Sequence, residues 1–250
     1  MICRRNVMRI IVVENYEEMS AKGAELFVEV MTAKKNCVIG LATGSTPIGL
    51  YNNLAKACAE GKVDFSEVTS VNLDEYYPLA PDNDQSYRYF MNKNLFDKVN
   101  IKKENTFVPD GTAKDPEAAC KEYEQRIDAL GGIDIQVLGI GRNGHIGFNE
   151  PDANGLFAET HLTALTENTI EANSRFFASA DEVPKHALTM GIGSVFKARK
   201  IVIMANGADK ADAIKKMVEG PISTMCPASL LCLHPDVTLI CDKSAYSLVK

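Results

Sequence analysis

The sequence predicts an α/β protein, a single Rossmann-like domain whose mostly parallel sheet is covered by helices on both faces. Short apolar segments rich in β-branched residues alternate with longer amphipathic ones, as βα units require. No internal repeat, low-complexity segment or linker-like run divides the chain, so residues 8–250 are expected to form one domain. Residues 1–7 precede the first predicted strand, and we expect them to be a disordered N-terminal extension.

The predicted elements follow from this alternation. The strands are expected at residues 9–13, 37–42, 68–73, 133–140, 200–205 and 237–241. The helices are expected at residues 16–33, 47–60, 115–130 and 208–218. Ligands of open parallel sheets bind beyond the carboxyl ends of the strands, so the active site is expected in the loops that follow the strands.

Composition and charge exclude several classes of protein. A net charge of −6 disfavours nucleic-acid binding. No apolar run approaches the roughly 18 residues of a membrane span, and the early "IIVV" is too short for a signal peptide. The 7 cysteines contain no C-x-x-C pair, which indicates free thiols rather than disulfides or a metal site. We therefore expect a cytoplasmic protein without a metal, nucleic-acid or membrane partner; a homo-oligomer is compatible with the sequence.

The loop "LATGSTP" follows the predicted strand at residues 37–42. Thr46 is expected to be the N-cap of the next helix, with Pro47 as its first residue. Gly44 lets a ligand approach the backbone, and the hydroxyls of Ser45 and Thr46 add donors to the free N–H groups of the first turn. The G-K-[ST] ending of a nucleotide-binding loop is missing, so a single phosphate is the expected ligand. A well-capped helix without a ligand is the alternative.

The segment "NLDEYYP" ends the predicted strand at residues 68–73. Asp74 is a candidate general base because partial burial at the sheet edge raises the pKa of a carboxyl. Glu75 has the weaker claim, since adjacent residues face different ways. An Asp that merely forms a turn before Pro78 is the alternative.

The segment "MANGADKA" again predicts a strand, a turn and a helix. Lys210 falls in the first turn of that helix, where a cation opposes the helix dipole. This placement indicates an anionic ligand beside Lys210; a solvated lysine is the alternative.

The stretch "GIGRNGHIGFNEP" at residues 139–151 opens with the glycine pattern of a dinucleotide-binding loop. Such a loop must lead straight into a helix, but a Gly, an Asn and a Pro in the following residues disfavour one. We expect no dinucleotide cofactor here. The loop is instead expected to present Asn143, His145 and Glu150 to one point, with His145 as a proton carrier rather than a structural histidine.

Five motifs together resemble those of the glucosamine-6-phosphate deaminase family, also called the glucosamine/galactosamine-6-phosphate isomerases. They are "LATGSTP", "NLDEYY", "GIGRNGHIGFNEP", "NSRFF" and "ALTMGIG", and they occur in the family's order. The resemblance covers the chain from about Met8 nearly to its end. It implies a Rossmann-like fold and the reversible conversion of glucosamine 6-phosphate and water to fructose 6-phosphate and ammonium in amino sugar catabolism. No metal or organic cofactor is implied.

The resemblance also implies roles for the candidate residues. Asp74 matches the base that removes the proton from C2 of the open-chain sugar. His145 matches the residue that opens the sugar ring, and Glu150 matches its supporting carboxylate. The residues implied for binding the sugar phosphate are Gly44, Ser45, Thr46, Arg175 and Lys210.

Two features depart from the best-studied branch of that family. Asn143 stands where that branch carries aspartate; an amide can orient His145, but it stabilises a protonated imidazole less than a charge does. The segment "AETHLTALT" lacks the basic residues of the allosteric branch. We therefore expect no activation by N-acetylglucosamine 6-phosphate.

Two other functions remain open on the sequence. A 6-phosphogluconolactonase-like hydrolase on the same fold binds a sugar phosphate but needs no C2 base, so Asp74 is dispensable there. A non-catalytic sugar-phosphate-sensing domain usually accompanies a DNA-binding helix-turn-helix. The predicted sheet pattern begins at about Met8 and leaves no room for one, which disfavours the sensing function.

Overall fold

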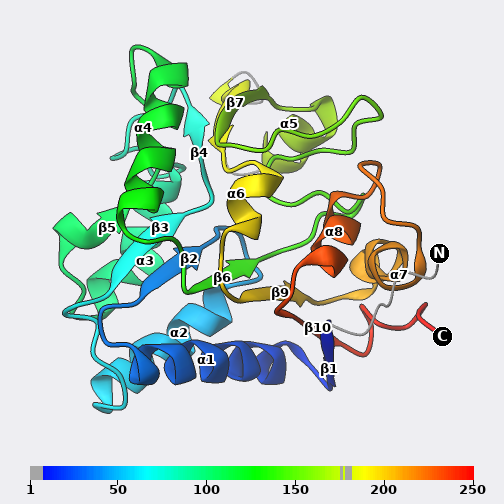
Figure 1. Ribbon diagram of the computed structural model, residues 1–250, viewed down its shortest axis with the longest axis horizontal. Coiled ribbons are helices and arrows are strands. Elements are labelled where there is room, and N and C mark those ends of the chain that lie inside the picture. The colour runs from blue at the N-terminus through cyan, green and yellow to red at the C-terminus, as the bar shows by residue number, and fades with distance from the viewer. Residues whose placement is uncertain (1–7, 175–176, 178–181) are drawn as a thin grey trace.

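The main sheet has seven parallel strands in the order β1-β10-β9-β6-β2-β3-β5 (Figure 1). The computed structural model describes residues 8–174, 177 and 182–250, so the predicted extension at residues 1–7 lies outside the described residues. The strands are β1 (Arg9–Val13), β2 (Val38–Leu41), β3 (Thr69–Asn72), β5 (Thr106–Phe107), β6 (Ile135–Leu138), β9 (Ile201–Ala205) and β10 (Val237–Asp242). The six predicted strands are all confirmed, and the short β5 adds an edge.

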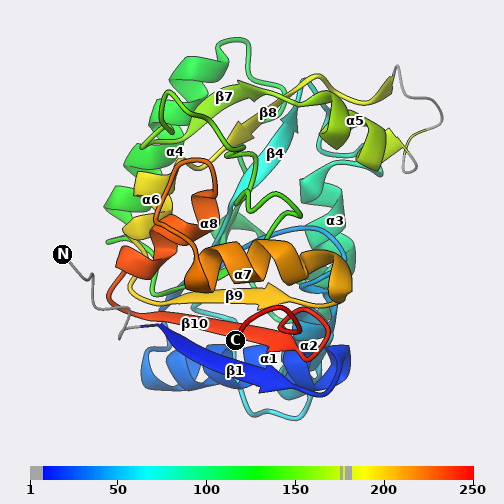
Figure 2. The ribbon, with the colours of Figure 1, turned by 90° about the vertical axis from the view of Figure 1, so that its right-hand side faces the viewer.

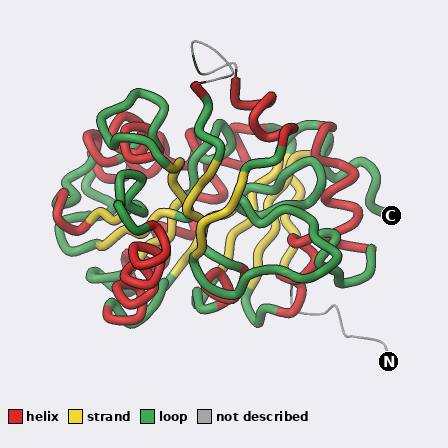
Figure 3. Tube along the Cα trace, turned by 90° about the horizontal axis from the view of Figure 1, so that it is seen from above, coloured by secondary structure: helices red, strands yellow, loops and turns green. Residues whose placement is uncertain are grey.

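Helices cover both faces of this sheet, as predicted. Figure 2 shows α1 and α2 on one side of β9 and β10 and α7 on the other, and Figure 3 shows helices on both sides of the strands. The helices are α1 (Tyr16–Ala33), α2 (Ile48–Ala59), α3 (Tyr87–Asn94), α4 (Pro116–Ala129), α5 (Glu167–Ser174), α6 (Ile192–Phe196), α7 (Ala211–Glu219) and α8 (Pro227–Leu230). The helix expected at residues 208–218 begins with a 3₁₀ turn, Ala208–Lys210.

A second, antiparallel sheet in the order β4-β8-β7 was not expected. It consists of β4 (Asp74–Tyr77), β7 (His161–Ala164) and β8 (His186–Thr189). The active site is predicted in loops that follow the strands, but Asp74 and Glu75 lie in β4 and not in a loop. The chain passes from β3 through Leu73 directly into β4, and Asp74 pairs with Thr189 of β8.

Local sequence explains where the first helix begins and which face it buries. The Asn15 side chain caps α1 by accepting a hydrogen bond from the Glu18 N–H, as an N-cap residue does. Met19, Phe27 and Met31 repeat at helical spacing and are buried against the sheet and α2. The apolar face of α1 thereby closes one side of the core.

The buried carboxylate of Asp134 connects three segments of the chain. Asp134, which is 7% exposed, accepts a hydrogen bond from the Val38 N–H at the start of β2. It also pairs with Lys34 at 2.8 Å and with Arg199 at 3.2 Å. Lys34 lies at the C-terminal end of α1, Val38 at the start of β2, and Arg199 in the segment before β9. The contacts of Asp134 therefore hold these three segments next to one another.

We expect Asp134→Ala to lower the free energy of unfolding by about 2 to 3 kcal/mol, because it leaves a buried N–H and two cations without their acceptor. Denaturant unfolding measures this change. Asp128→Ala is the control, since Asp128 pairs with Lys197 at the surface and its loss is expected to cost below about 1 kcal/mol. Equal losses in the two variants contradict the assignment.

Candidate active site

The candidate residues lie at one edge of the main sheet. β9, β6, β2 and β3 are consecutive neighbours and run parallel, so their carboxyl ends meet at this edge. The segments after them carry Lys210, the stretch at residues 139–151, Gly44 to Thr46, and Asp74. Arg175 lies outside the described residues.

Side chains and backbone join these segments to one another. The Phe148 N–H donates to Thr189 Oγ1 at 3.2 Å, and Asn149 Nδ2 donates to the Met190 carbonyl at 2.8 Å. Thr189 is the residue paired with Asp74, so the loop that carries His145 is held beside the start of β4. On its other side, Arg142 of the same loop pairs with Asp209 at 3.0 Å, next to Lys210.

Asp74 has the environment of a base. Its side chain is buried, with 6% exposure, and no hydrogen bond to its carboxyl is found in the described part of the chain. Burial, followed by the charge of Glu75, raises the pKa of Asp74 to about 8. A carboxylate that is neither solvated nor hydrogen-bonded binds a proton more readily, so Asp74 is suited to proton abstraction from carbon.

The neighbouring Glu75 is occupied by backbone contacts. Its carboxylate accepts hydrogen bonds from the N–H groups of Tyr76 at 2.9 Å, Tyr87 at 2.8 Å and Arg88 at 2.9 Å. Burial raises the pKa of Glu75 to about 7, although these donors and the Arg88 charge act to lower it. Glu75 therefore holds the start of α3, which leaves Asp74 as the available carboxyl.

His145, Glu150 and Asn143 form a connected group. His145 Nδ1 lies 3.1 Å from Glu150 Oε1, within ion-pair distance although the ring nitrogen is not aligned as a hydrogen-bond donor. Asn143 Nδ2 donates to Glu150 Oε2 at 2.6 Å, and Asn143 Oδ1 accepts from the His145 backbone N–H at 3.1 Å. Asn143 thus orients the carboxylate and the loop rather than the imidazole itself.

The pKa of Glu150 is lowered by its contacts. Burial acts to raise this pKa, but the interactions with His145, Asn143 and Thr169 outweigh it. Thr169 Oγ1 in α5 donates to Glu150 Oε1 at 3.1 Å. Sequence reasoning missed Thr169 because no motif or spacing connects it with the loop.

The glycines of the stretch at residues 139–151 make room for side chains, and no helix follows them. A Cβ added to Gly141 would lie 2.3 Å from His145 Nε2. The imidazole therefore occupies the space that the side chain of any residue other than glycine needs at position 141. Gly147 has φ +59°, and a Cβ on it lies 2.9 Å from Thr189 Oγ1. The loop is therefore shaped around His145 and the end of β8.

The turn before α2 differs from its predicted capping. α2 begins at Ile48, and Pro47 stands at the N-cap without a side-chain hydrogen bond, so the prediction of Thr46 as N-cap is wrong. The reason is Tyr16 of α1. Its hydroxyl accepts from the Gly49 N–H at 2.8 Å, the donor that a capping Thr46 is suited to bind.

This arrangement leaves donors free at the edge of the sheet. Gly44 has φ +98°, and no atom of the described residues lies within 4 Å of an added Cβ, so its backbone is open to approach. Within the described residues, the N–H groups of residues 43–46 and the hydroxyls of Ser45 and Thr46 donate no hydrogen bond. The turn has the donors that an anion requires.

Lys210 supplies a cation at the same edge. It is half-buried at the N-terminus of α7, and among the described carboxylates none pairs with it. Burial, with the charge of Arg142, lowers the pKa of Lys210, while Asp209 acts to raise it. A sheltered ammonium at a helix N-terminus is stabilised by an anionic ligand.

The described residues offer neither a metal site nor a membrane-spanning helix. They contain no group of three or more His, Cys, Asp or Glu side chains able to hold a metal ion. None of the described helices is both long and apolar enough to cross a membrane.

Comparison with known proteins gives consistent matches along the chain. The family model of glucosamine-6-phosphate isomerases/6-phosphogluconolactonase matches residues 14–240. A protein of Thermoanaerobacter pseudethanolicus named glucosamine-6-phosphate deaminase is 54% identical, with 97% of this chain and 95% of that protein covered. A protein of Halothermothrix orenii with the same name is 56% identical, with coverage of 97% and 100%.

Solved structures agree with this assignment. A structure described as a monomeric glucosamine-6-phosphate deaminase superposes with a TM-score of 0.92 at 45% identity, covering 96% of this chain and all (100%) of that one. A 6-phosphogluconolactonase from Thermotoga maritima has a TM-score of 0.73 at 20% identity, covering 94% of this chain and 100% of its own, and shares the fold. The chain therefore belongs to the family of glucosamine-6-phosphate isomerases and 6-phosphogluconolactonases.

Proposed function

We propose that the protein is a glucosamine-6-phosphate deaminase, which converts glucosamine 6-phosphate and water reversibly to fructose 6-phosphate and ammonium. The observation that carries this proposal is the buried Asp74 carboxyl with its raised pKa, held beside the loop of His145 and Glu150. The relatives named as deaminases at 54–56% identity support the same reaction.

In the proposed mechanism His145 opens the sugar ring by moving a proton from the C1 hydroxyl to the ring oxygen. Glu150 supports the protonated imidazole, and Asn143 keeps Glu150 in place. Ring opening creates an aldehyde at C1, which makes the proton on C2 acidic. Two proton carriers are needed because one step acts on oxygens and the other on carbon.

Asp74 removes the C2 proton and forms an enol-type intermediate. Return of a proton to C1 leaves an imine at C2. Water adds to this imine, and ammonia leaves with its bonding electrons to give the C2 ketone. Burial keeps Asp74 from being solvated, so its proton affinity is available for this step.

The phosphate is proposed to bind the turn of Gly44, Ser45 and Thr46, with Lys210 and Arg175 as cationic partners. Among the described residues, the N–H groups and hydroxyls of the turn have no acceptor and the Lys210 ammonium has no carboxylate partner, which supports this site. Arg175 enters the proposal through its motif alone. All of these residues come from one chain, so a homo-oligomer is not required to complete the site.

The 6-phosphogluconolactonase reaction is the second candidate on this fold. Lactone hydrolysis removes no proton from C2. The lactonase reaction therefore gives the buried Asp74 carboxyl no role as a base. The lactonase structure cited above, at 20% identity, supports the fold and not the reaction. We further propose that the enzyme acts in the cytoplasm, where its free cysteines remain reduced.

Ammonia release from glucosamine 6-phosphate tests the reaction and the base together. We expect release by the wild type and a loss of about a hundredfold or more in Asp74→Asn, because an amide does not accept the C2 proton. Asp82→Asn, in an exposed loop, is the control and is expected to keep its activity. No release by the wild type, together with hydrolysis of 6-phosphogluconolactone, overturns the proposal.

The pKa of Asp74 predicts the pH dependence. Because the ionised form is the base and its pKa is raised to about 8, kcat/KM is expected to fall as the pH drops below 8. The slope approaches about tenfold per pH unit for a single group. A rate profile from pH 6 to 9 measures it; a flat profile between pH 6 and 8 contradicts an Asp74 base with a raised pKa.

Gly141→Ala tests the seating of His145. The new methyl group occupies space taken by the imidazole, so we expect a fall in kcat of about tenfold or more while the fold is kept. Gly139→Ala is the matched control, because no atom of the described part of the chain lies within 4 Å of a Cβ there. Steady-state kinetics and thermal unfolding are compared; equal kcat values in the two variants refute this role of the loop.

A further inference from the structure

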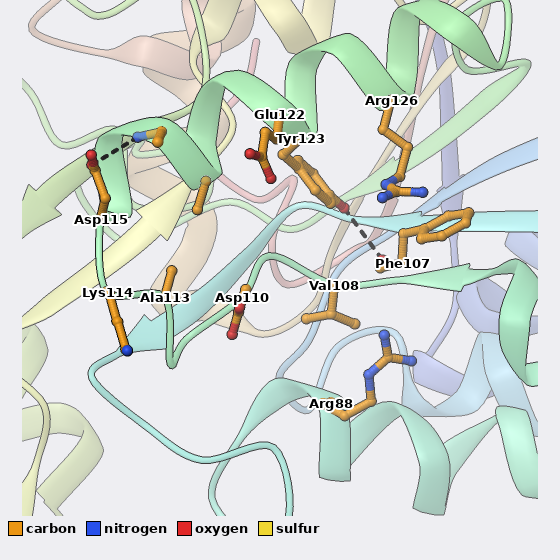
Figure 4. Close-up of a pocket in the computed structure, with 12 residues that line it drawn as sticks. Arg88, Phe107, Val108, Asp110, Ala113, Lys114, Asp115, Glu122, Tyr123 and Arg126 are labelled. Atoms are coloured by element: carbon orange, nitrogen blue, oxygen red, sulfur yellow. Dashed lines mark hydrogen bonds between the residues drawn. The ribbon is translucent and has the colours of Figure 1, made fainter.

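A cavity of about 430 Å³ lies away from the candidate active site, between α3, β5 and α4 (Figure 4). None of the described residues placed in the active site lines it. Its charged lining residues are Arg88, Asp110, Lys114, Asp115, Glu122 and Arg126. Its volume falls in the range of small-molecule sites, and neither the mechanism nor the resemblance gives it a role.

The end of the cavity beside β5 is cationic. Arg88 Nη1 donates to Thr106 Oγ1 at 2.7 Å and Nη2 donates to the Thr106 carbonyl at 2.9 Å, which fixes the half-buried guanidinium. The Arg126 guanidinium lies 4.5 Å from the centroid of the Phe107 ring. Neither guanidinium lies within ion-pair distance of a carboxylate among the described residues, although the charge of the nearby Glu75 acts on the pKa of Arg88.

The other end is acidic. Asp115 caps α4 through the Ala118 N–H at 3.0 Å, and Asp110 accepts from the Thr112 N–H at 2.9 Å. Each carboxylate uses only Oδ1 in these contacts. Between residues 115 and 126 the helix axis rises about 16 Å, so this end is well separated from Arg126. In Figure 4 Asp115 lies at the left and the two arginines lie at the right, with Asp110 between Asp115 and Arg88.

The two remaining charges do not cancel this separation. Glu122 is exposed on α4 between the two ends, and Lys114 is exposed beside the acidic end. In Figure 4 the Lys114 side chain extends away from α4. A ligand with a single charge therefore satisfies only one end of the cavity, whereas a ligand with opposite charges at its ends satisfies both.

We propose that this cavity binds a small metabolite with a phosphate group at one end and an ammonium group at the other, and that its occupancy acts on Asp74. Arg88 and Arg126 bind the phosphate, for which the planar guanidinium offers paired donors. Asp110 and Asp115 bind the ammonium through their remaining oxygens. Phe107 and Tyr123 provide apolar walls for the carbon skeleton.

Two hydrogen bonds connect the cavity with the proposed base. The Tyr123 hydroxyl donates to the Asn72 carbonyl at 2.7 Å, and the Arg88 N–H donates to Glu75 Oε2 at 2.9 Å. Asn72 and Glu75 stand on either side of Asp74 in the sequence. A ligand that engages Arg88 and packs on Tyr123 therefore biases the segment that positions Asp74. The binding itself does not depend on the proposed function, whereas this effect on Asp74 rests on it.

Calorimetric titration with phosphoethanolamine, which carries both groups and is not a sugar, tests the binding. We expect Arg126→Glu to weaken its binding about tenfold, because the charge is reversed next to the phosphate. Lys121→Glu, the same charge change at an exposed position of α4 outside the cavity, is expected to leave it unchanged. Ethyl phosphate and ethanolamine, which each lack one group, are expected to bind more weakly than phosphoethanolamine.

Equal affinities in Arg126→Glu and Lys121→Glu overturn the site, as does loss of all binding in Lys210→Ala alone, which assigns the ligand to the active site. Ethyl phosphate binding as tightly as phosphoethanolamine overturns the role of the acidic end. Arg126→Gln, with a milder change, repeats the comparison, and thermal unfolding confirms that each variant is folded.

The effect of phosphoethanolamine on catalysis is measured as kcat. Saturating glucosamine 6-phosphate is used, so that phosphoethanolamine does not compete with the substrate at the active site. We expect phosphoethanolamine to change kcat in the wild type and in Lys121→Glu, but not in Arg126→Glu. An unchanged kcat in the wild type overturns the effect on Asp74. If no variant and no wild-type enzyme releases ammonia, the proposed function is refuted. The proposal that the cavity binds the ligand is then judged from the calorimetric results only.

Discussion

The burial of the Asp74 carboxyl is the constraint on which the rest of the site depends. The chain leaves the buried β3 and enters β4 without a loop, so pairing with Thr189 places this carboxyl out of solvent. Glu75 then takes the available backbone donors at the start of α3, and Asp74 is left without hydrogen bonds in the described part of the chain. The fold thereby keeps one carboxyl basic and the next one structural.

The loop of His145 complements this carboxyl. Glycines remove side chains where the imidazole and Thr189 need space, and the amide of Asn143 bridges the loop backbone to Glu150. An aspartate at position 143, as in the related branch, places a second carboxylate against Glu150, where the present chain has a neutral donor. Asn143 therefore favours an ionised Glu150 rather than acting on the imidazole directly.

Elements with local sequence patterns could be predicted, and those that depend on distant partners could not. The strands of the main sheet and helices α1, α2, α4 and α7 follow from apolar runs and helical spacing, and they lie close to their expected ranges. β4, β7 and β8 are short and partly polar, and they pair across long separations such as Asp74 with Thr189. The capping of α2 failed for the same reason, since Tyr16 of another helix binds the Gly49 N–H. Arg175 lies outside the described residues, so its predicted role stays a prediction.

The central claim is that Asp74 breaks the C2–H bond before ammonia leaves. Glucosamine 6-phosphate carrying deuterium at C2 tests it most directly, with single-turnover ammonia release and analysis of the hexose product. The proposed mechanism predicts slower release than from the unlabelled sugar, and fructose 6-phosphate whose deuterium has moved to C1 or to the solvent. An aldose product that retains deuterium at C2, formed at an unchanged rate, contradicts it.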